Sequence, residues 1–170
     1  MQSLTSYRSL QVSLVLAAAI GMGYALLFLQ QHLGLSPCPL CVFQRIGLMI
    51  MGGFALIAAL FNPRSKLVKL GLWLGSLLGI GWATGVAARH VWLQHLPADQ
   101  VPSCGPGLDY WLDTLPMNEV LNQVFAGSGE CAVVDWSFLG LSIPEQSVIF
   151  FSLLIVIHLL LLFRIMRPIT

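Results

Sequence analysis

The chain has 170 residues, of which 57% are hydrophobic and only 9% are charged. This composition excludes an ordinary soluble domain and predicts a membrane protein. The formal net charge of +1 conceals a segregation of the two signs along the chain, and it gives no indication of nucleic-acid binding.

Four apolar stretches are long enough to cross a membrane as helices: about residues 12–29, 42–61, 67–88 and 148–163. A crossing needs about 20 residues at roughly 1.5 Å each, so the last stretch is at the short end of the range. The first stretch also has the three regions of a signal peptide, but its apolar run continues past Ala19 to Leu29, which favours a retained span. We therefore expect an all-α membrane protein, a four-helix transmembrane bundle with residues 1–170 as one domain.

Six of the eight Lys and Arg residues fall in three segments outside the spans. These are Arg8 before the first span, Arg64, Lys66 and Lys69 between the second and third, and Arg164 and Arg167 after the fourth. By the positive-inside rule these segments and both termini lie in the cytoplasm. All acidic residues fall within residues 89–147. We expect loops 30–41 and 89–147 on the opposite face of the membrane.

The segment 89–147 is too long for a hairpin turn and too small for an independent hydrophobic core. Its residues 118–125 have an acidic and apolar pattern that predicts one short helix on the membrane surface. Interfacial anchors are expected at four aromatic residues: Trp92, Tyr110, Trp111 and Trp136. In the third span, a repeat of every fourth residue predicts a face for close packing: Gly71, Gly75 and Gly79.

The four cysteines all fall on the face expected to be away from the cytoplasm: Cys38, Cys41, Cys104 and Cys131. In bacteria that face is oxidising. Sequence alone leaves three pairings open, although spacing favours Cys38 with Cys41. A two-residue spacer constrains little of the unfolded chain, so this pair is predicted to be chemically active. For the second pair a structural disulfide stays open, whereas zinc is disfavoured because Cys104 and Cys131 lie far apart in the sequence.

A helix is expected to begin near Cys41, which places its sulfur close to the positive end of the helix dipole. Arg45 lies one turn further on the same face, either as an interfacial anchor or as a cation that stabilises a Cys41 thiolate or a reduced electron acceptor. His90, at the outer end of the third span, is either an anchor or a further group of that site. Because the chain has no haem motif and no glycine-rich nucleotide fingerprint, a membrane quinone is the expected acceptor.

Three groups of residues form one pattern between the four spans: Pro37-Cys38-Pro39-Leu40-Cys41 with Gln44-Arg45, Arg89-His90, and Cys131 with Trp136-Ser137-Phe138-Leu139-Gly140-Leu141 and Pro144. On this pattern the chain resembles the DsbB family, the disulfide bond formation proteins B of Gram-negative bacteria. The resemblance covers nearly the whole chain. It implies a protein-disulfide:quinone oxidoreductase of the bacterial inner membrane, which oxidises a periplasmic DsbA-like thioredoxin-fold enzyme and passes the electrons to ubiquinone or menaquinone, with no metal.

The resemblance also implies a role for each cysteine. Cys104 would form the mixed disulfide with the partner, and Cys131 would be its intramolecular mate. Cys38 would exchange with Cys131, and Cys41 would be the thiolate that faces the quinone. Arg45 would polarise the quinone, with His90 close by.

The sequence leaves three other functions open. An enzyme like vitamin K epoxide reductase is disfavoured, because there the Cys-x-x-Cys pair is expected on a late helix, whereas here it precedes the second. A non-enzymatic membrane protein with two structural disulfides would leave Arg45 beside Cys41 without an explanation. A DsbB paralogue dedicated to one client protein is a further alternative.

Overall fold

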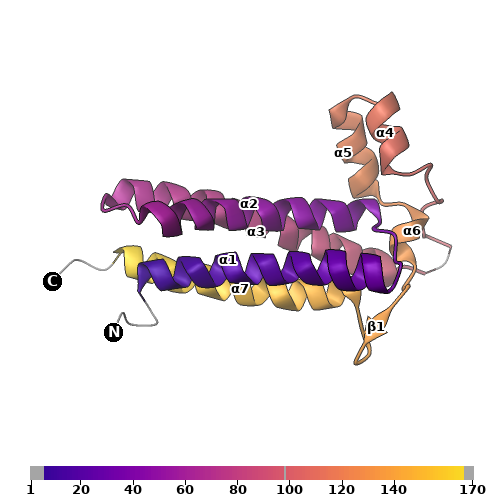
Figure 1. The fold of residues 1–170 in the computed structure, drawn as a ribbon. Helices are drawn as coiled ribbons and strands as arrows, with labels where there is room; N and C mark the ends of the chain where they lie inside the picture. The colour runs from indigo at the N-terminus through magenta and orange to yellow at the C-terminus, as the bar shows by residue number, and fades with distance from the viewer. Residues whose placement is uncertain (1–5, 98, 167–170) are drawn as a thin grey trace.

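The computed structural model describes residues 6–97 and 99–166, so Arg167 lies outside the described residues. Four long helices run side by side and form the body of the molecule (Figure 1). Each is long and apolar enough to cross a membrane: α1 Tyr7–Gly23 with its continuation η1 Tyr24–His32, α2 Pro39–Phe61, α3 Lys66–Gln94 and α7 Ile143–Met166. The prediction of an all-α membrane protein built as a four-helix bundle is confirmed.

The two ends of the bundle differ in what they carry. The first and last described residues lie at one end, together with the turn between α2 and α3 (Figure 1). The segment between α3 and α7 lies at the opposite end and holds every acidic residue except Glu145, which is in the first turn of α7. The basic residues near the termini and near the α2–α3 turn are thus separated in space from the acidic loop. The side of the membrane that each end faces stays a prediction.

Local sequence signals determine where α2 begins and ends. Pro39 occupies the first helical position, where a missing N–H costs no hydrogen bond, and Cys38 is the N-cap residue. The Cys38 sulfur accepts a hydrogen bond from the Cys41 backbone N–H at 3.4 Å. At the other end, Asn62 adopts a left-handed conformation with φ of 38°, which asparagine tolerates better than most residues. The Cys-x-x-Cys pair is therefore built into the N-terminus of a membrane helix.

Small residues let α2 and α3 approach closely. A Cβ atom on Gly79 would lie 2.6 Å from the Met51 backbone nitrogen, and one on Gly47 would lie 2.7 Å from the Gly79 carbonyl oxygen. A Cβ on Gly75 would meet the Phe54 ring at 2.7 Å. The predicted glycine face is therefore correct for Gly75 and Gly79 but wrong for Gly71, where a Cβ would meet nothing within 4 Å. Close backbone contact therefore holds the middle of α2 against the middle of α3.

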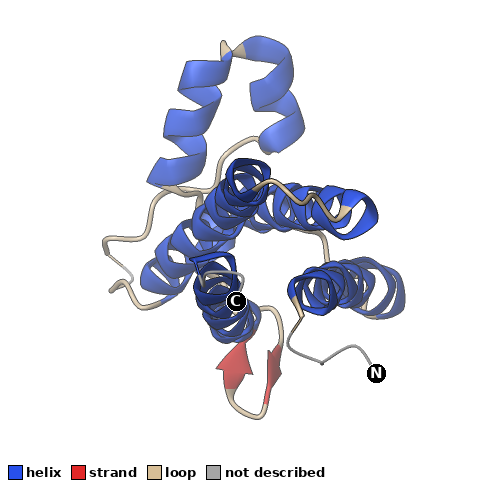
Figure 2. Ribbon diagram, turned by 90° about the vertical axis from the view of Figure 1, so that its left-hand side faces the viewer, coloured by secondary structure: helices blue, strands red, loops and turns tan. Residues whose placement is uncertain are grey.

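The segment between α3 and α7 contains more structure than the one predicted helix. It holds helices α4 Leu108–Thr114, α5 Met117–Ala126 and α6 Gly129–Ala132, and strands β1 Ser137–Phe138 and β2 Leu141–Ser142. The strands pair antiparallel in a small hairpin. Figure 2 shows α4 and α5 standing away from the long helices on one side and the hairpin on another. The expected helix at residues 118–125 is α5, and the other elements had no clear periodic signal because they are very short.

A buried apolar cluster joins α4 and α5 to the bundle. Val120 and Val124 of α5 are at most 1% exposed, and they belong to one apolar cluster with Leu93 of α3 and Leu40 of α2. Trp111 is part of the same cluster and only 7% exposed. The prediction that Trp111 is an interfacial anchor is therefore wrong, because the α4–α5 pair needs a large apolar residue to cover its own core.

Arg89 fastens the C-terminal end of α5 to α3. Its guanidinium donates hydrogen bonds to the carbonyl oxygens of Phe125 and Ala126, both at 3.0 Å, and stacks over the Trp92 ring at 4.1 Å from its centroid. A cation at a helix C-terminus is favourable because the terminal carbonyls carry partial negative charge. This contact helps to bring the chain that follows α5, including α6, back to the bundle.

Candidate functional site: a cysteine and histidine cluster beside an apolar cleft

The start of α2 and the end of α3 bring two cysteines and a histidine together. The four cysteines of the chain are free thiols in the structure. The Cys38 and Cys41 sulfurs are 3.2 Å apart. His90 is 3% exposed and presents both ring nitrogens to this pair, Nε2 at 3.8 Å from the Cys38 sulfur and Nδ1 at 4.0 Å from the Cys41 sulfur. One imidazole therefore contacts both sulfurs of the Cys-x-x-Cys pair.

Gln44 orients this histidine. Its side-chain nitrogen lies 3.2 Å from His90 Nδ1, and Gln44 is only 5% exposed. Because an amide offers either a donor or an acceptor when it turns over, Gln44 can serve either neutral tautomer of the ring. In the sequence, Gln44 is part of the family pattern but carries no predicted role of its own. Its position three residues after Cys41 on a helix, the spacing of a shared face, was the available signal.

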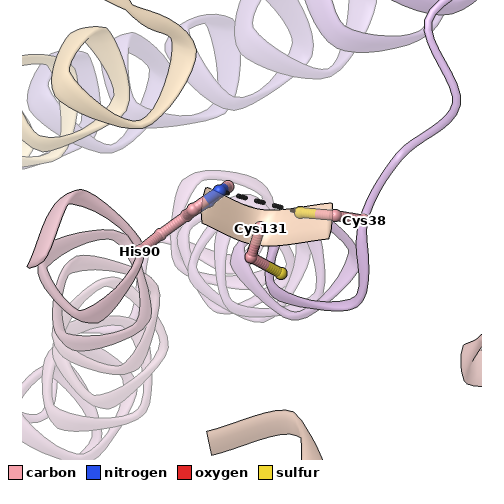
Figure 3. A group of neighbouring side chains, drawn as sticks. All are labelled: Cys38, His90 and Cys131. Atoms are coloured by element: carbon pink, nitrogen blue, oxygen red, sulfur yellow. Dashed lines mark hydrogen bonds between the residues drawn. The ribbon is translucent and has the colours of Figure 1, made fainter. Parts of the chain in front are cut away.

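Cys131 reaches the same place from the long loop. It lies on α6, is 1% exposed, and forms with Cys38 and His90 a group whose ligand atoms are all within 4.8 Å of one another (Figure 3). Its interaction with the neighbouring Cys38 thiol, together with burial, raises the pKa of the Cys131 thiol well above its usual range. Ser128 Oγ lies 3.7 Å from the Cys131 sulfur. The fold thus places one cysteine of the loop against the first cysteine of the helix.

Cys104 lies outside this cluster but next to α6. It is exposed, and the Ser103 carbonyl oxygen accepts a hydrogen bond from the Gly129 N–H at 3.2 Å. A Cβ atom on Gly129 would lie 2.8 Å from the Pro102 carbonyl oxygen and 2.9 Å from the Cys104 sulfur. Only glycine fits there without displacing the backbone. The exposed Cys104 and the buried Cys131 are therefore held on adjoining segments.

Arg45 is held by neutral oxygen atoms. Its guanidinium donates to the Gln30 side-chain oxygen and, at 3.4 Å, to the Ala25 carbonyl oxygen. Within residues 6–97 and 99–166 no carboxylate forms an ion pair with it. These acceptors fix the position of the guanidinium without neutralising its charge, so the charge is available to an anion or a polarised oxygen.

Both acceptors belong to η1, a nine-residue π-helix that continues α1. A π-helix shifts the side chains that follow it relative to an α-helix, and such segments are often found at functional sites. Here the π-helix presents Gln30 and the Ala25 carbonyl to Arg45. No sequence signal predicted it, because the apolar pattern of this span is continuous.

A cleft of about 380 Å³ opens between the long helices at this end of the bundle. Most of its lining is apolar, with residues such as Leu29, Leu48, Phe150 and Phe151. The polar groups include five of the residues described above: Cys38, Cys41, Gln44, Arg45 and His90. An apolar cleft with a few convergent polar groups is the usual form of a small-molecule site. Of the predicted site residues, Cys104 and Cys131 are absent from its lining.

The structure has four helices of membrane length and a small-molecule cleft that is lined in part by cysteines. These features define a multi-pass membrane protein equipped for thiol chemistry. Residues 7–161 match the model of the DsbB family, described as disulfide bond formation protein DsbB. The chain belongs to the DsbB family, and its role is that of an oxidoreductase in bacterial disulfide bond formation.

Relatives called disulfide bond formation protein B match this chain along all or nearly all of its length. The disulfide bond formation protein B of Psychrobacter cryohalolentis is 75% identical over 170 residues, which are 100% of this chain and 97% of the relative. The protein of the same name from Psychrobacter arcticus is 74% identical with the same coverage. The one from Acinetobacter baumannii is 56% identical over 94% of this chain and 92% of the relative.

Proposed function

We propose that the protein oxidises the dithiol of a periplasmic DsbA-like thioredoxin-fold enzyme and passes the electrons through its two cysteine pairs to a membrane quinone. The observation that carries this proposal is the position of Cys131, which lies within 4.8 Å of both Cys38 and His90 while its segment adjoins that of the exposed Cys104. The loop pair is thus reachable from solvent at Cys104, and its buried member Cys131 lies within 4.8 Å of Cys38, which lines the cleft.

The first exchange takes place at the exposed loop. With Cys104 and Cys131 joined as a disulfide, a thiolate of the partner attacks the Cys104 sulfur, and the S–S bond breaks toward Cys131. The second thiol of the partner then attacks the mixed disulfide and releases Cys104. The partner leaves with a disulfide, and Cys104 and Cys131 hold its two electrons as thiols. Exposure of Cys104 favours it as the attacked sulfur.

The second exchange takes place at the buried contact. Cys131 attacks the Cys38 sulfur of a Cys38–Cys41 disulfide, and Cys41 leaves as thiolate. Cys104 then attacks Cys131 in the Cys38–Cys131 bond, which restores the loop disulfide and leaves Cys38 and Cys41 reduced. The contact between Cys131 and Cys38 supports this order, since the sulfur that Cys131 meets is that of Cys38.

The residues of the cleft fit a quinone. Apolar side chains suit its ring and isoprenoid tail, and the Arg45 guanidinium can donate to a carbonyl oxygen. When bound, a quinone supplies an acceptor for two electrons and two protons. Cys41 provides the thiolate on the cleft side, and His90, held by Gln44, provides a group that can donate or accept a proton beside both sulfurs.

The charge distribution also bears on the membrane location and orientation of the protein. We place the protein in the bacterial inner membrane with both termini in the cytoplasm and with residues 30–41 and 89–147 in the periplasm. The position of Arg8, Arg64, Lys66, Lys69 and Arg164 at the end of the bundle opposite the acidic loop supports this orientation. Because the chain belongs to the DsbB family, the alternative like vitamin K epoxide reductase is not retained, and a family member dedicated to one client is the remaining alternative.

The experiment is steady-state oxidation of a reduced DsbA-like partner by purified protein and ubiquinone, followed by quinone absorbance. Replacing any one of the four cysteines with serine should abolish the coupled reaction. In the Cys104→Ser protein, quinone should still oxidise Cys38 and Cys41. Coupled turnover by the Cys131→Ser protein at the normal rate would overturn the proposed route.

A further inference from the structure

We propose that the reduced protein binds one soft divalent metal ion, Zn²⁺ in the cell, through Cys38, His90 and Cys131. The sulfur atoms of the two cysteines and a ring nitrogen of the histidine all lie within 4.8 Å of one another. Figure 3 shows the three side chains coming from three separate segments. Sequence spacing disfavoured zinc because the cysteines of the second pair are far apart, but the fold brings Cys131 to Cys38 instead.

The distances fit a tetrahedral site. With Zn–S bonds of about 2.3 Å and Zn–N bonds of about 2.0 Å, tetrahedral angles separate two sulfur ligands by about 3.8 Å and a sulfur from a nitrogen by about 3.5 Å. Cys38 Sγ and His90 Nε2 are already 3.8 Å apart. The remaining distances between ligand atoms are at most 4.8 Å, and thiolate with imidazole is the donor set that zinc prefers.

The surroundings support a metal-ligating histidine. Metal-bound imidazoles usually have a hydrogen-bond partner on the other ring nitrogen, and Gln44 occupies that position at 3.2 Å from Nδ1. When Nε2 binds an ion, the proton sits on Nδ1 and the Gln44 amide turns its oxygen toward it. Glu130 and Asp135, both exposed, line the mouth of the adjacent cleft and favour the approach of a cation.

Cys41 is not a ligand in this arrangement. Its sulfur faces His90 Nδ1, the nitrogen opposite the one that faces Cys38. The fourth position is therefore open to water, as in sites with three protein ligands. Binding forms two Zn–S bonds and one Zn–N bond, and the two thiol protons pass to the solvent.

The site exists only while Cys38 and Cys131 are both thiols. A disulfide at either cysteine removes a ligand, so the oxidised protein should not hold the ion. In the reduced protein the ion would occupy the two sulfurs that the proposed relay joins, and it would inhibit exchange between them. This consequence rests on the proposed function, whereas the binding itself needs neither a partner nor a quinone.

The test is a titration of the reduced, detergent-purified protein with Co²⁺ under anaerobic conditions, followed by the sulfur-to-cobalt charge-transfer band. We expect one ion per chain, competed by Zn²⁺, and no band with the oxidised protein. Cys38→Ser, Cys131→Ser and His90→Gln should each weaken binding by more than about 100-fold, whereas the matched controls Cys104→Ser and Cys41→Ser should bind as the wild type does.

A second measurement does not depend on variants. Zn²⁺ should slow the alkylation of Cys38 and Cys131 in the reduced wild-type protein and leave that of Cys104 unchanged. Absence of a Co²⁺ band, or a band that survives Cys131→Ser, would overturn the proposal, the latter by showing that the Cys-x-x-Cys pair binds alone. Normal partner oxidation without metal binding would overturn this inference and leave the proposed function intact.

Discussion

His90 Nε2 lies 3.8 Å from the Cys38 sulfur, although 52 positions separate the two residues in the chain. The contact joins the last turns of α3 to the first residue before α2. It depends on the close approach of these helices at Gly47 and Gly79, since side chains there would move the helices apart. The bundle interior therefore determines which groups meet at its end.

The first prediction concerns topology. A reporter that is active only outside the cytoplasm should work when fused after Gln100 and fail when fused after Ser65. The reason is the positive-inside rule, because Arg64, Lys66 and Lys69 lie at the α2–α3 turn. Colony or cell-based reporter activity measures the result. The reverse pattern would place the cysteines in the reducing compartment and exclude the proposed relay.

The second prediction separates the two loop cysteines by reactivity. In the reduced protein, a maleimide should modify the exposed Cys104 at least about tenfold faster than Cys131. Cys131 is 1% exposed, and in the reduced protein burial and its interaction with the Cys38 thiol raise its pKa, so it is poorly accessible and rarely a thiolate. Peptide mass spectrometry over time measures both rates in one sample. After denaturation the rates should converge, and similar rates in the folded protein would contradict the buried position of Cys131.

The third prediction concerns Gly129. In Gly129→Ala the new methyl group would lie 2.8 Å from the Pro102 carbonyl oxygen, so the segment that carries Cys104 must move. Because a displacement of about 1 Å can slow a reaction about 100-fold, we expect partner oxidation to fall roughly 10- to 100-fold. Oxidation of Cys38 and Cys41 by quinone should remain normal.

Gly53→Ala is the matched control for Gly129→Ala. A Cβ atom on Gly53 meets nothing within 4 Å, and alanine is a better helix former than glycine. This variant should be as active as the wild type. Equal partner oxidation by Gly129→Ala would show that the position of Cys104 against α6 is unimportant for the exchange.

The sequence allowed prediction of what depends on local composition. Apolar length predicted the four membrane helices, and the spacing of Cys38 and Cys41 before an apolar run predicted a thiol pair at a helix start. The acidic and apolar pattern predicted α5. Each of these features is set by residues within a few turns of one another.

Other features depend on contacts between distant segments and could not be predicted in that way. The resemblance to the DsbB family implied that Cys131 meets Cys38, but nothing in the residues near Cys131 indicates it, since α6 has only four residues and is positioned by the loop around it. Trp111 is of a residue type that is common at membrane interfaces, but it is buried in a cluster with side chains of α5. The π-helix η1 has no distinct pattern, although it supplies the oxygens that hold Arg45.

The fourth prediction tests the charge in the cleft. Arg45→Met keeps most of the apolar stem and removes the guanidinium, so α2 should still insert. Loss of a hydrogen bond from a charged group costs about 1.5–3 kcal/mol, so the KM for quinone should rise roughly 10- to 100-fold. Formation of the mixed disulfide at Cys104 should be nearly unaffected, because that residue is not part of the cleft lining. Kinetics with varied quinone at saturating reduced partner, together with trapping of the mixed disulfide, measure both.

Gln30→Leu distinguishes the charge from its placement. Gln30 accepts a hydrogen bond from Arg45, so its loss leaves the charge in the cleft but frees the guanidinium to move. We expect a smaller rise in the quinone KM for Gln30→Leu than for Arg45→Met. The quinone KM of Arg45→Lys should also lie between those of the wild type and Arg45→Met, because lysine keeps the charge without the planar guanidinium. Unchanged quinone kinetics in Arg45→Met would reduce this arginine to an anchor for η1, and the acceptor would then have to bind elsewhere.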